Sequence, residues 1–295
     1  MMRAHFLNRI SMKSLYIFKM LSMKNLLCFC MILCITSCDV EPNQQLDERS
    51  WTLTWSDEFD GDQGESPNPE NWTYDIGTGD NGWGNEELQY YTDRPENVSL
   101  DGNGNLVIRA LRETFAGAPF TSARITTQGL FDQQYGRFEA RIKTPYGPGI
   151  WPAFWMLGSN INTVSWPQCG EIDIMEMRGQ EPNIMHGSVH GPGYSAGEAL
   201  TKSFALENDR FDTDFHIYAI EWGVDYIDFF IDDFLYQRIT PEDVNELDDQ
   251  DAEWVFDSEF YIIMNVAVGG TFVGFPTSQT PFPQEMVVDY VRVYQ

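Results

Sequence analysis

Apolar residues recur along this chain in short alternating runs, separated by glycine, proline, asparagine and aspartate. The run Phe138–Lys143 alternates cleanly between apolar and charged residues, and Val287–Tyr294 alternates in a similar way. A period of two is typical of β-strands with one buried face. Few windows show a helical period, and Pro241–Asp249 is a candidate for one short helix. With no convincing repeat and no internal linker, residues 51–295 are predicted to form one all-β sandwich domain.

The most informative strand is 171–176, with the sequence Glu-Ile-Asp-Ile-Met-Glu. Strict alternation places Glu171 and Asp173 on one face but turns Glu176 toward the apolar face, where a carboxylate is costly. One extra residue bulged out near positions 174–175 returns Glu176 to the acidic face. Like charges held this close raise at least one pKa, as an enzyme needing both a carboxylate and a carboxylic acid requires. The alternative is an edge strand with a solvated acidic face.

A second strand, 151–157, carries aromatic residues in an unusual arrangement. Alternation puts Trp151, Ala153 and Trp155 on one face. Two indoles beside a small residue form a flat platform on which the C–H faces of sugar rings stack. The alternative is that these tryptophans belong to the core, as tryptophans of β-sandwiches usually do. The glycine-rich segment 82–92 mixes aromatic and amide side chains and suits the rim of a cleft.

The first 37 residues read as a targeting segment. A basic region precedes the apolar run 26–36, which is too short for a membrane span and is typical of a secretory signal. The run ends in Ile-Thr-Ser-Cys at Cys38, which resembles a bacterial lipobox. That resemblance implies a signal peptide over 1–37 (its true start possibly Met23), a lipid on Cys38 and a tether over 38–50. The chain is then an exported lipoprotein of the outer membrane or cell surface; the alternative is an uncleaved anchor helix.

The charge and the cysteines narrow the function further. The whole chain has a net charge of −27, and removal of residues 1–37, with five basic and no acidic residues, takes it to −32. Such a surface repels phosphate backbones, so nucleic acid is excluded as a partner, and sulfated polysaccharides are disfavoured. Processing leaves two cysteines, Cys38 and Cys169, so an intramolecular disulfide framework is excluded and the core must supply the stability.

These features together resemble glycoside hydrolase family 16, and within it the bacterial laminarinase-like endo-β-1,3-glucanases. The resemblance covers about residues 51–295 and is carried by motifs at 55–61, 84–91, 151–157, 166–176, 186–194 and 288–294. It implies a β-jelly-roll sandwich of two curved antiparallel sheets, with a substrate cleft on the concave sheet. Agar-cleaving relatives share the acidic strand, whereas relatives that cleave mixed-linkage glucan have it without the bulge.

The resemblance also implies roles for single residues. Glu171 is the expected nucleophile, Glu176 the general acid/base, and Asp173 the neighbour that tunes both. Retention of configuration requires the two glutamate carboxyl groups to lie about 5–5.5 Å apart. The residues implied to bind substrate are Asn85, Arg109, Trp151, Trp155, Trp166 and His190. For His190 a purely structural role is the alternative.

Cofactors and partners complete the expectation. Catalysis needs no cofactor, but the resemblance implies a possible structural calcium ion at Asp289, with backbone carbonyls near Glu58 and Gly104. The expected partners are a β-glucan and, through the lipid anchor only, a membrane; the protein itself is expected to be a monomer. Mixed-linkage β-1,3-1,4-glucan and agar-type galactan are alternative substrates. A non-catalytic surface glucan-binding protein is the alternative of another class, against which the intact acidic triad argues.

Overall fold

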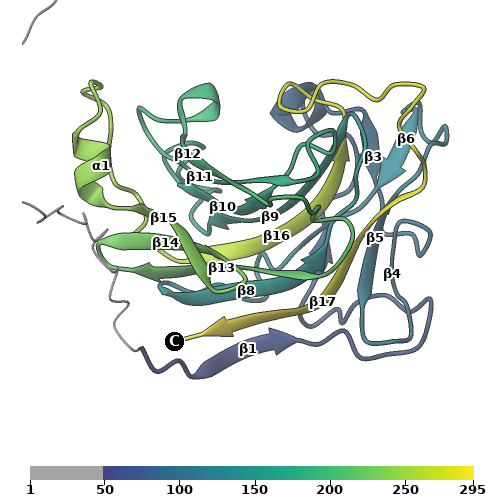
Figure 1. Cartoon of the computed structure of the whole chain (residues 1–295), viewed down its shortest axis with the longest axis horizontal. Coiled ribbons are helices and arrows are strands. Elements are labelled where there is room, and N and C mark those ends of the chain that lie inside the picture. Colours follow the sequence, from purple (N-terminus) through teal and green to yellow (C-terminus); the bar gives the residue numbers. More distant parts are fainter. Residues whose placement is uncertain (1–48) are drawn as a thin grey trace, which may run out of the picture. The chain divides into compact units, whose positions relative to one another are not determined.

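Figure 1 shows a computed structural model of the protein, which describes residues 49–295. The predicted signal peptide, the lipidation site at Cys38 and nearly all of the tether lie outside these residues. Residues Ser50–Gln295 form one compact unit. Among residues 49–295, no helix has the length and apolar character to cross a membrane.

The unit is built almost entirely from strands. They are β1 (Leu53–Asp57), β2 (Thr73–Tyr74), β3 (Gln89–Tyr91), β4 (Val98–Leu100), β5 (Leu106–Ala110), β6 (Phe120–Ser122), β7 (Arg124–Thr126), β8 (Gly136–Lys143), β9 (Ile150–Gly158), β10 (Glu171–Glu176), β11 (Ile184–His190), β12 (Leu200–Ala205), β13 (His216–Gly223), β14 (Tyr226–Ile231), β15 (Phe234–Ile239), β16 (Phe260–Val268) and β17 (Gln284–Tyr294). The described helices are all short: η1 (Gly82–Glu86), η2 (Ala196–Glu198) and α1 (Pro241–Asn245).

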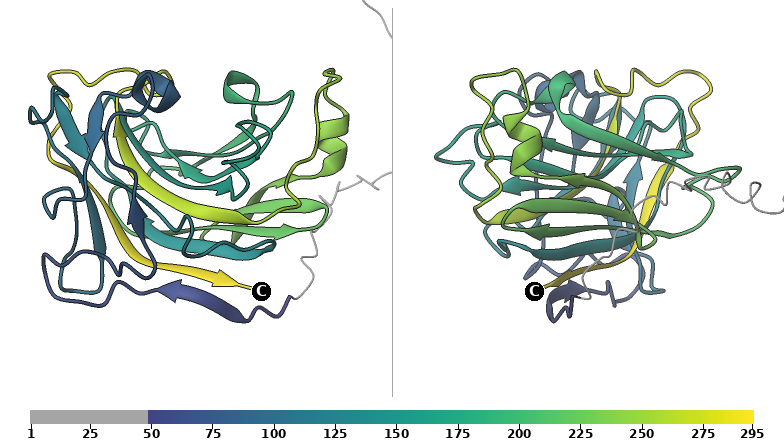
Figure 2. Two further views of the ribbon diagram at one scale, coloured as in Figure 1. Left: turned by 180° about the vertical axis from the view of Figure 1, so that it is seen from behind. Right: turned by 60° about the vertical axis from the view of Figure 1, so that its left-hand side comes forward.

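Two antiparallel sheets contain nearly all of these strands. The outer sheet has the order β15-β14-β13-β8-β17-β5-β4, with β1 paired to β17. The second, which we call the cleft sheet, has the order β12-β11-β10-β9-β16-β7-β2. Figures 1 and 2 show the two sheets stacked and curving together. The predicted β-jelly-roll sandwich is confirmed.

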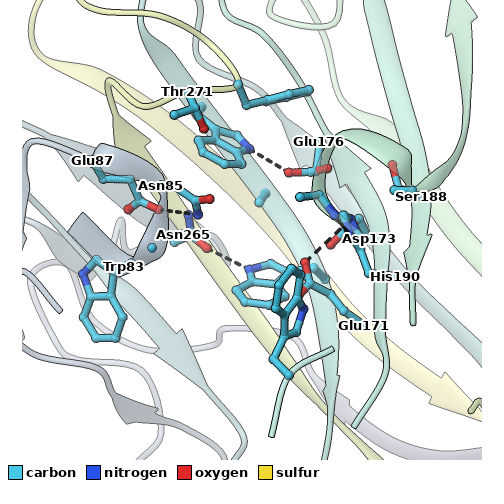
Figure 3. A pocket seen from close by; sticks show the side chains of 18 of the residues that line it. Trp83, Asn85, Glu87, Glu171, Asp173, Glu176, Ser188, His190, Asn265 and Thr271 are labelled. Atoms are coloured by element: carbon cyan, nitrogen blue, oxygen red, sulfur yellow. Dashed lines mark hydrogen bonds and ion pairs between the residues drawn. The ribbon is translucent and has the colours of Figure 1, made fainter. Parts of the chain in front are cut away.

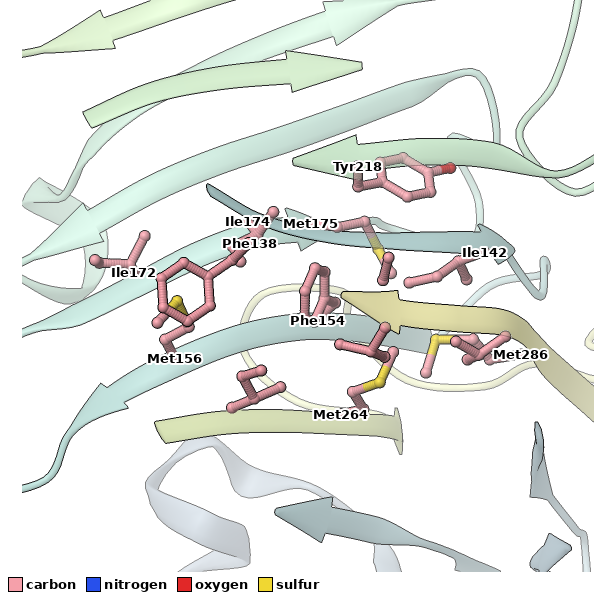
Figure 4. Packing of buried hydrophobic residues seen from close by; sticks show 14 of the residues in the cluster. Phe138, Ile142, Phe154, Met156, Ile172, Ile174, Met175, Tyr218, Met264 and Met286 are labelled. Carbon is pink, nitrogen blue, oxygen red and sulfur yellow. The ribbon is translucent and has the colours of Figure 1, made fainter. Parts of the chain in front are cut away.

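The hydrophobic core fills the space between the sheets, as Figure 4 shows. Phe138 and Ile142 enter it from β8, and Phe154 and Met156 enter it from β9; none of the four has solvent-accessible surface. Because side chains alternate along a strand, the other face of β9 is left for the tryptophans. Full burial of each large apolar side chain contributes about 1.5–3 kcal/mol, so this core holds the cleft sheet in a fixed curvature.

A β-bulge interrupts β10, as the sequence predicts. Against β9, Asp173 pairs with Trp155 and Met175 pairs with Phe154, so Ile174 is the extra residue. Both bulge residues turn inward, and Ile174 and Met175 are almost completely buried in the core. The bulge shifts the alternation of side chains between the two faces by one residue. Glu176 therefore returns to the face that carries Glu171 and Asp173.

The predicted short helix is also present. It begins at a capping box in which Thr240 accepts a hydrogen bond from the Asp243 backbone N–H, while the Asp243 carboxylate accepts one from the Thr240 backbone. Pro241 occupies the first turn, where its missing N–H has no cost. The helix ends at Asn245, four residues before the predicted boundary.

Candidate active site

A cleft crosses the concave face of the cleft sheet, and Figure 3 shows a close view of the side chains that line it. Its floor includes residues of β9, β10 and β11, which are neighbours in the sheet. Arg124 of β7 and Thr201 of β12 also line it. Because β7 and β12 lie on opposite sides of β10, the acidic strand lies in the middle of a cleft that extends to both sides.

All three acids of β10 line this cleft. Asp173 is the most enclosed, with 2% of its surface exposed. Its Oδ2 lies 2.9 Å from Nε2 of His190, and Oε1 of Glu171 lies 3.9 Å from the same nitrogen. The bulge therefore creates the predicted row of acids, and His190 of β11 contacts two of them.

Each of the two glutamates accepts a hydrogen bond from an indole. Trp166 Nε1 donates to Glu171 Oε2 over 2.7 Å, and Trp151 Nε1 donates to Glu176 Oε1 over 2.8 Å. One oxygen of each carboxyl group is thereby occupied, and the other remains available for chemistry. The sequence predicted that these tryptophans shape sugar subsites, and the hydrogen bonds add a second role, which is to orient the two glutamates.

The acids have different proton affinities. Burial raises the pKa of Glu176 to about 7, with a further contribution from the negative charge of Glu171, although His190 and the Trp151 hydrogen bond oppose the shift. Burial also raises the pKa of Asp173 well above its usual range, and the charges of the two glutamates add to this effect. Glu176 can therefore hold a proton near neutral pH and release it again, as a general acid/base must.

His190 presents a protonated Nε2 to Asp173 in either of its protonation states, at 2.9 Å from Asp173 Oδ2. The backbone N–H of Ala196 donates to Nδ1 of His190 over 3.0 Å, so the proton of the neutral ring lies on Nε2, facing Asp173. Burial lowers the pKa of His190, but the surrounding carboxylates, with Asp173 foremost, outweigh it and raise the pKa to about 10. In both protonation states Nε2 carries a proton, which a metal ion held by Glu171, Asp173 and His190 would have to displace.

One side of the cleft is rich in aromatic and amide groups. Trp155 Nε1 donates to Asn265 Oδ1 over 2.8 Å, and the Arg124 guanidinium lies 4.8 Å from the Trp155 ring and 4.7 Å from the Trp83 ring. Asn85 lines the same side, as predicted. Sequence reasoning missed Arg124 and Asn265, and it named Trp83 only as part of the segment 82–92 expected at the rim of the cleft. A single basic residue in the otherwise uncharged segment 120–127 was the available signal for Arg124.

The sequence is similar to proteins of a known enzyme family, and this similarity agrees with the geometry of the cleft. The profile of the glycosyl hydrolases family 16 matches residues 81–290. The chain belongs to glycosyl hydrolase family 16. A β-glucanase of Rhodothermus marinus is 45% identical over 249 residues, which cover 83% of this chain and 85% of that protein. The family resemblance stated from the motifs is confirmed.

Solved structures of family 16 enzymes resemble this fold closely. The laminarinase catalytic domain of Thermotoga maritima matches with a TM-score of 0.78 and 46% identity, covering 84% of this chain and 99% of that one. The endo-β-1,3-glucanase of Pyrococcus furiosus matches with a TM-score of 0.79 and 47% identity, covering 85% and 96%. The similarity therefore covers nearly the whole of both solved chains.

One predicted substrate residue of this family 16 chain lies elsewhere. Arg109 belongs to β5 of the outer sheet, where its Nε forms an ion pair with Glu285 at 2.6 Å and its Nη1 donates to the Glu96 backbone carbonyl. The prediction that Arg109 faces the cleft is wrong. Its strand belongs to the other layer of the sandwich, and alternation along a strand does not reveal which layer that strand joins.

The predicted calcium residue, Asp289, also belongs to the outer sheet. Its carboxylate forms an ion pair with the Arg141 guanidinium. Glu58, near which a backbone carbonyl ligand was predicted, has its own carboxylate paired with Arg292. Oxygen ligands suit calcium, but a cation at Asp289 must compete with the Arg141 guanidinium already in contact, so the Asp289 side chain fits the ion poorly. The calcium ion stays a prediction.

Proposed function

We propose that this chain is a retaining, endo-acting glycoside hydrolase that cleaves internal β-1,3 linkages of laminarin-type β-glucan. The observation that carries the proposal is the bulged strand β10, which presents Glu171 and Glu176 to one cleft, each held by an indole N–H. The β-glucanase, laminarinase and endo-β-1,3-glucanase named above support the substrate class. A cleft that extends to both sides of the acidic strand suits attack in the interior of a polysaccharide.

In the first step the Glu171 carboxylate attacks the anomeric carbon. Trp166 occupies Oε2 of Glu171, so Oε1 is the attacking oxygen. The bond from the anomeric carbon to the glycosidic oxygen breaks as Glu176 gives its proton to that oxygen. Because Trp151 donates to Oε1 of Glu176, this proton resides on Oε2. The products are a glycosyl ester on Glu171 and a free sugar hydroxyl.

In the second step water hydrolyses the glycosyl ester on Glu171. The Glu176 carboxylate removes a proton from a water molecule, whose oxygen attacks the anomeric carbon while the bond to Glu171 breaks. Glu176 is then protonated and Glu171 is again a carboxylate, so the cycle closes. Two inversions at one carbon give net retention. Asp173, which contacts His190, lies close enough to both glutamates that their charges add to the effect of burial in raising its pKa.

A substrate panel tests the proposed function. The purified protein should release reducing ends from laminarin faster than from mixed-linkage β-1,3-1,4-glucan, and should release none from agarose. Products separated by size should begin as long oligosaccharides, because cleavage is internal. A Glu171→Gln variant, which is isosteric with the wild type, serves as the control for contaminating activity. A wild-type protein that binds laminarin but releases no reducing ends would support the glucan-binding alternative and overturn the hydrolase proposal.

We also propose that the enzyme is a monomeric lipoprotein, exported and anchored through Cys38 at the outer membrane or cell surface. The support is the sequence, in which a basic region, a short apolar run and the Ile-Thr-Ser-Cys ending stand in this order. Cys38→Ala should move the enzyme from the membrane fraction to the soluble fraction of fractionated cells. Cys34→Ala, four residues earlier in the same run, is the matched control and should remain in the membrane fraction. Membrane retention of Cys38→Ala would contradict the anchor.

A further inference from the structure

A buried chain of hydrogen bonds leads from the β16 backbone to the rim of the cleft. The Val268 backbone N–H donates to Gln89 Oε1 over 2.7 Å, and Gln89 Nε2 donates to Glu87 Oε2 over 2.6 Å. Gln89 is completely buried. Because a backbone N–H can only donate, it fixes the orientation of the Gln89 amide, whose NH2 group must then face Glu87.

Glu87 in turn fixes the orientation of the Asn85 side-chain amide. Its Oε1 accepts from Asn85 Nδ2 over 3.3 Å, and its Oε2 accepts a second bond, from the Tyr91 hydroxyl, over 3.1 Å. A carboxylate has no donor, so the NH2 group of Asn85 turns toward Glu87. Figure 3 shows the two side chains joined by this bond at the edge of the cleft. The carbonyl oxygen of Asn85 is then the group left to meet a ligand.

Only a residue that accepts through both oxygens can fill this position. A glutamine at position 87 would set its own NH2 group against that of either Gln89 or Asn85. Burial raises the pKa of Glu87, although the bonds from Gln89 and Asn85 and the charge of Arg124 lower it. A carboxyl group held in such a costly place, with no ion-pair partner at bonding distance among residues 49–295, is poorly explained by packing alone.

We propose that Glu87 is a positioning residue that fixes the Asn85 carbonyl oxygen toward the cleft and thereby selects sugars with a free hydroxyl there. The selectivity rests on the proposed function, because it concerns the glycan that the same cleft binds. A hydroxyl can donate to this oxygen. A sulfate or methyl substituent at the same position cannot, and leaves this acceptor without a partner once the glycan covers it.

The loop that carries these residues does not depend on Glu87 for its position. The Leu88 backbone N–H donates to the Val268 backbone carbonyl over 2.8 Å, and the Thr271 backbone N–H donates to the backbone carbonyl of Asn85 over 2.9 Å. These backbone bonds remain when Glu87 is replaced by the isosteric glutamine. A purely structural role and a positioning role therefore predict different results for Glu87→Gln.

A double-mutant cycle separates the two roles. Glu87→Gln is expected to lower kcat/KM on laminarin about tenfold, with the melting temperature lowered by a few degrees at most, because the backbone bonds of the loop remain. In the Asn85→Ala background the same substitution should lower kcat/KM less than about twofold, because Asn85 transmits the effect.

The preference for laminarin over partially sulfated laminarin should also shrink in Glu87→Gln. Glu113→Gln, at a carboxylate bonded to Arg94 and Thr121 and absent from the cleft lining, is the control and should leave all three values unchanged.

Additive losses in the two backgrounds, or an unchanged kcat/KM in Glu87→Gln, would overturn the proposal. The same cycle is measured a second time as laminarihexaose affinity by calorimetry, with Glu171→Gln present in every variant. The affinity measurement does not depend on turnover. If the protein binds the glucan but does not hydrolyse it, the proposed function is wrong, and the role of Glu87 can still be tested. Coupling below about twofold in affinity as well would assign Glu87 to the fold alone.

Discussion

Glu171→Ala is expected to lose laminarin hydrolysis almost completely, with kcat reduced by at least about 10⁴-fold. The reason is that the variant has no carboxylate to form the glycosyl ester, while Glu176 and the sugar platform remain. The measurement is reducing-end release from laminarin at fixed protein concentration. A variant within tenfold of the wild type would show that Glu171 is not the nucleophile.

Azide makes this first prediction stereochemically specific. The space left by the missing carboxylate can admit a small anion, which then attacks the anomeric carbon directly. With an activated aryl β-laminaribioside, Glu171→Ala plus azide should give the α-glycosyl azide, the product of a single inversion. A β-glycosyl azide from this variant would assign the nucleophile to another residue.

Glu176→Ala is expected to lose about 10²–10⁴-fold on laminarin, the usual contribution of general acid/base catalysis. Its loss should be smaller in the first step with an aryl glycoside, because a good leaving group departs without a proton. Azide should restore turnover of that substrate and give the β-glycosyl azide, because it replaces water in the second step. The opposite azide stereochemistry of the two variants distinguishes their roles, and the same stereochemistry from both would contradict the assignment.

The wild-type pH profile follows from the same residue. Burial and Glu171 raise the pKa of Glu176 to about 7, and the proton on Glu176 is needed in the first step. The rate on laminarin should therefore fall as the pH rises through about 7. In Glu176→Ala with the activated aryl substrate this alkaline limb should be absent. A limb that stays at the same pH in the variant would trace it to another group.

Much of the site could be predicted from local sequence, because the face of a strand on which a side chain lies depends only on its position among neighbouring residues. Strict alternation put Glu176 on the wrong face, and the cost of a buried carboxylate was enough to infer the bulge that β10 contains. The same rule placed Trp151 and Trp155 on the cleft face. Motif resemblance then added residues such as His190, whose contact with Asp173 lies between strands and has no signal in either strand alone.

What could not be predicted depends on contacts between distant segments. Arg109 was assigned to the cleft from the family resemblance, and alternation could not correct this because it gives the face of a strand but not its sheet. Trp166 was expected to stack on a sugar, yet it also donates to Glu171 from the segment that precedes β10. Asn85 was named from its motif, whereas the acceptor polarity that we infer for it arises from Val268, which is remote in sequence. Such directional networks become visible only when both ends of the hydrogen bonds are located.

The most direct test of the central claim is to trap the covalent intermediate. A 2-deoxy-2-fluoro β-laminaribioside with a good leaving group should form the glycosyl ester quickly and hydrolyse it slowly. Mass spectrometry of the digested protein should then find the added glycosyl mass on the peptide that contains β10, with fragmentation placing it on Glu171. A label on Glu176, or the absence of any label while laminarin is still hydrolysed, would contradict the assignment of Glu171 as the nucleophile of a retaining β-1,3-glucanase.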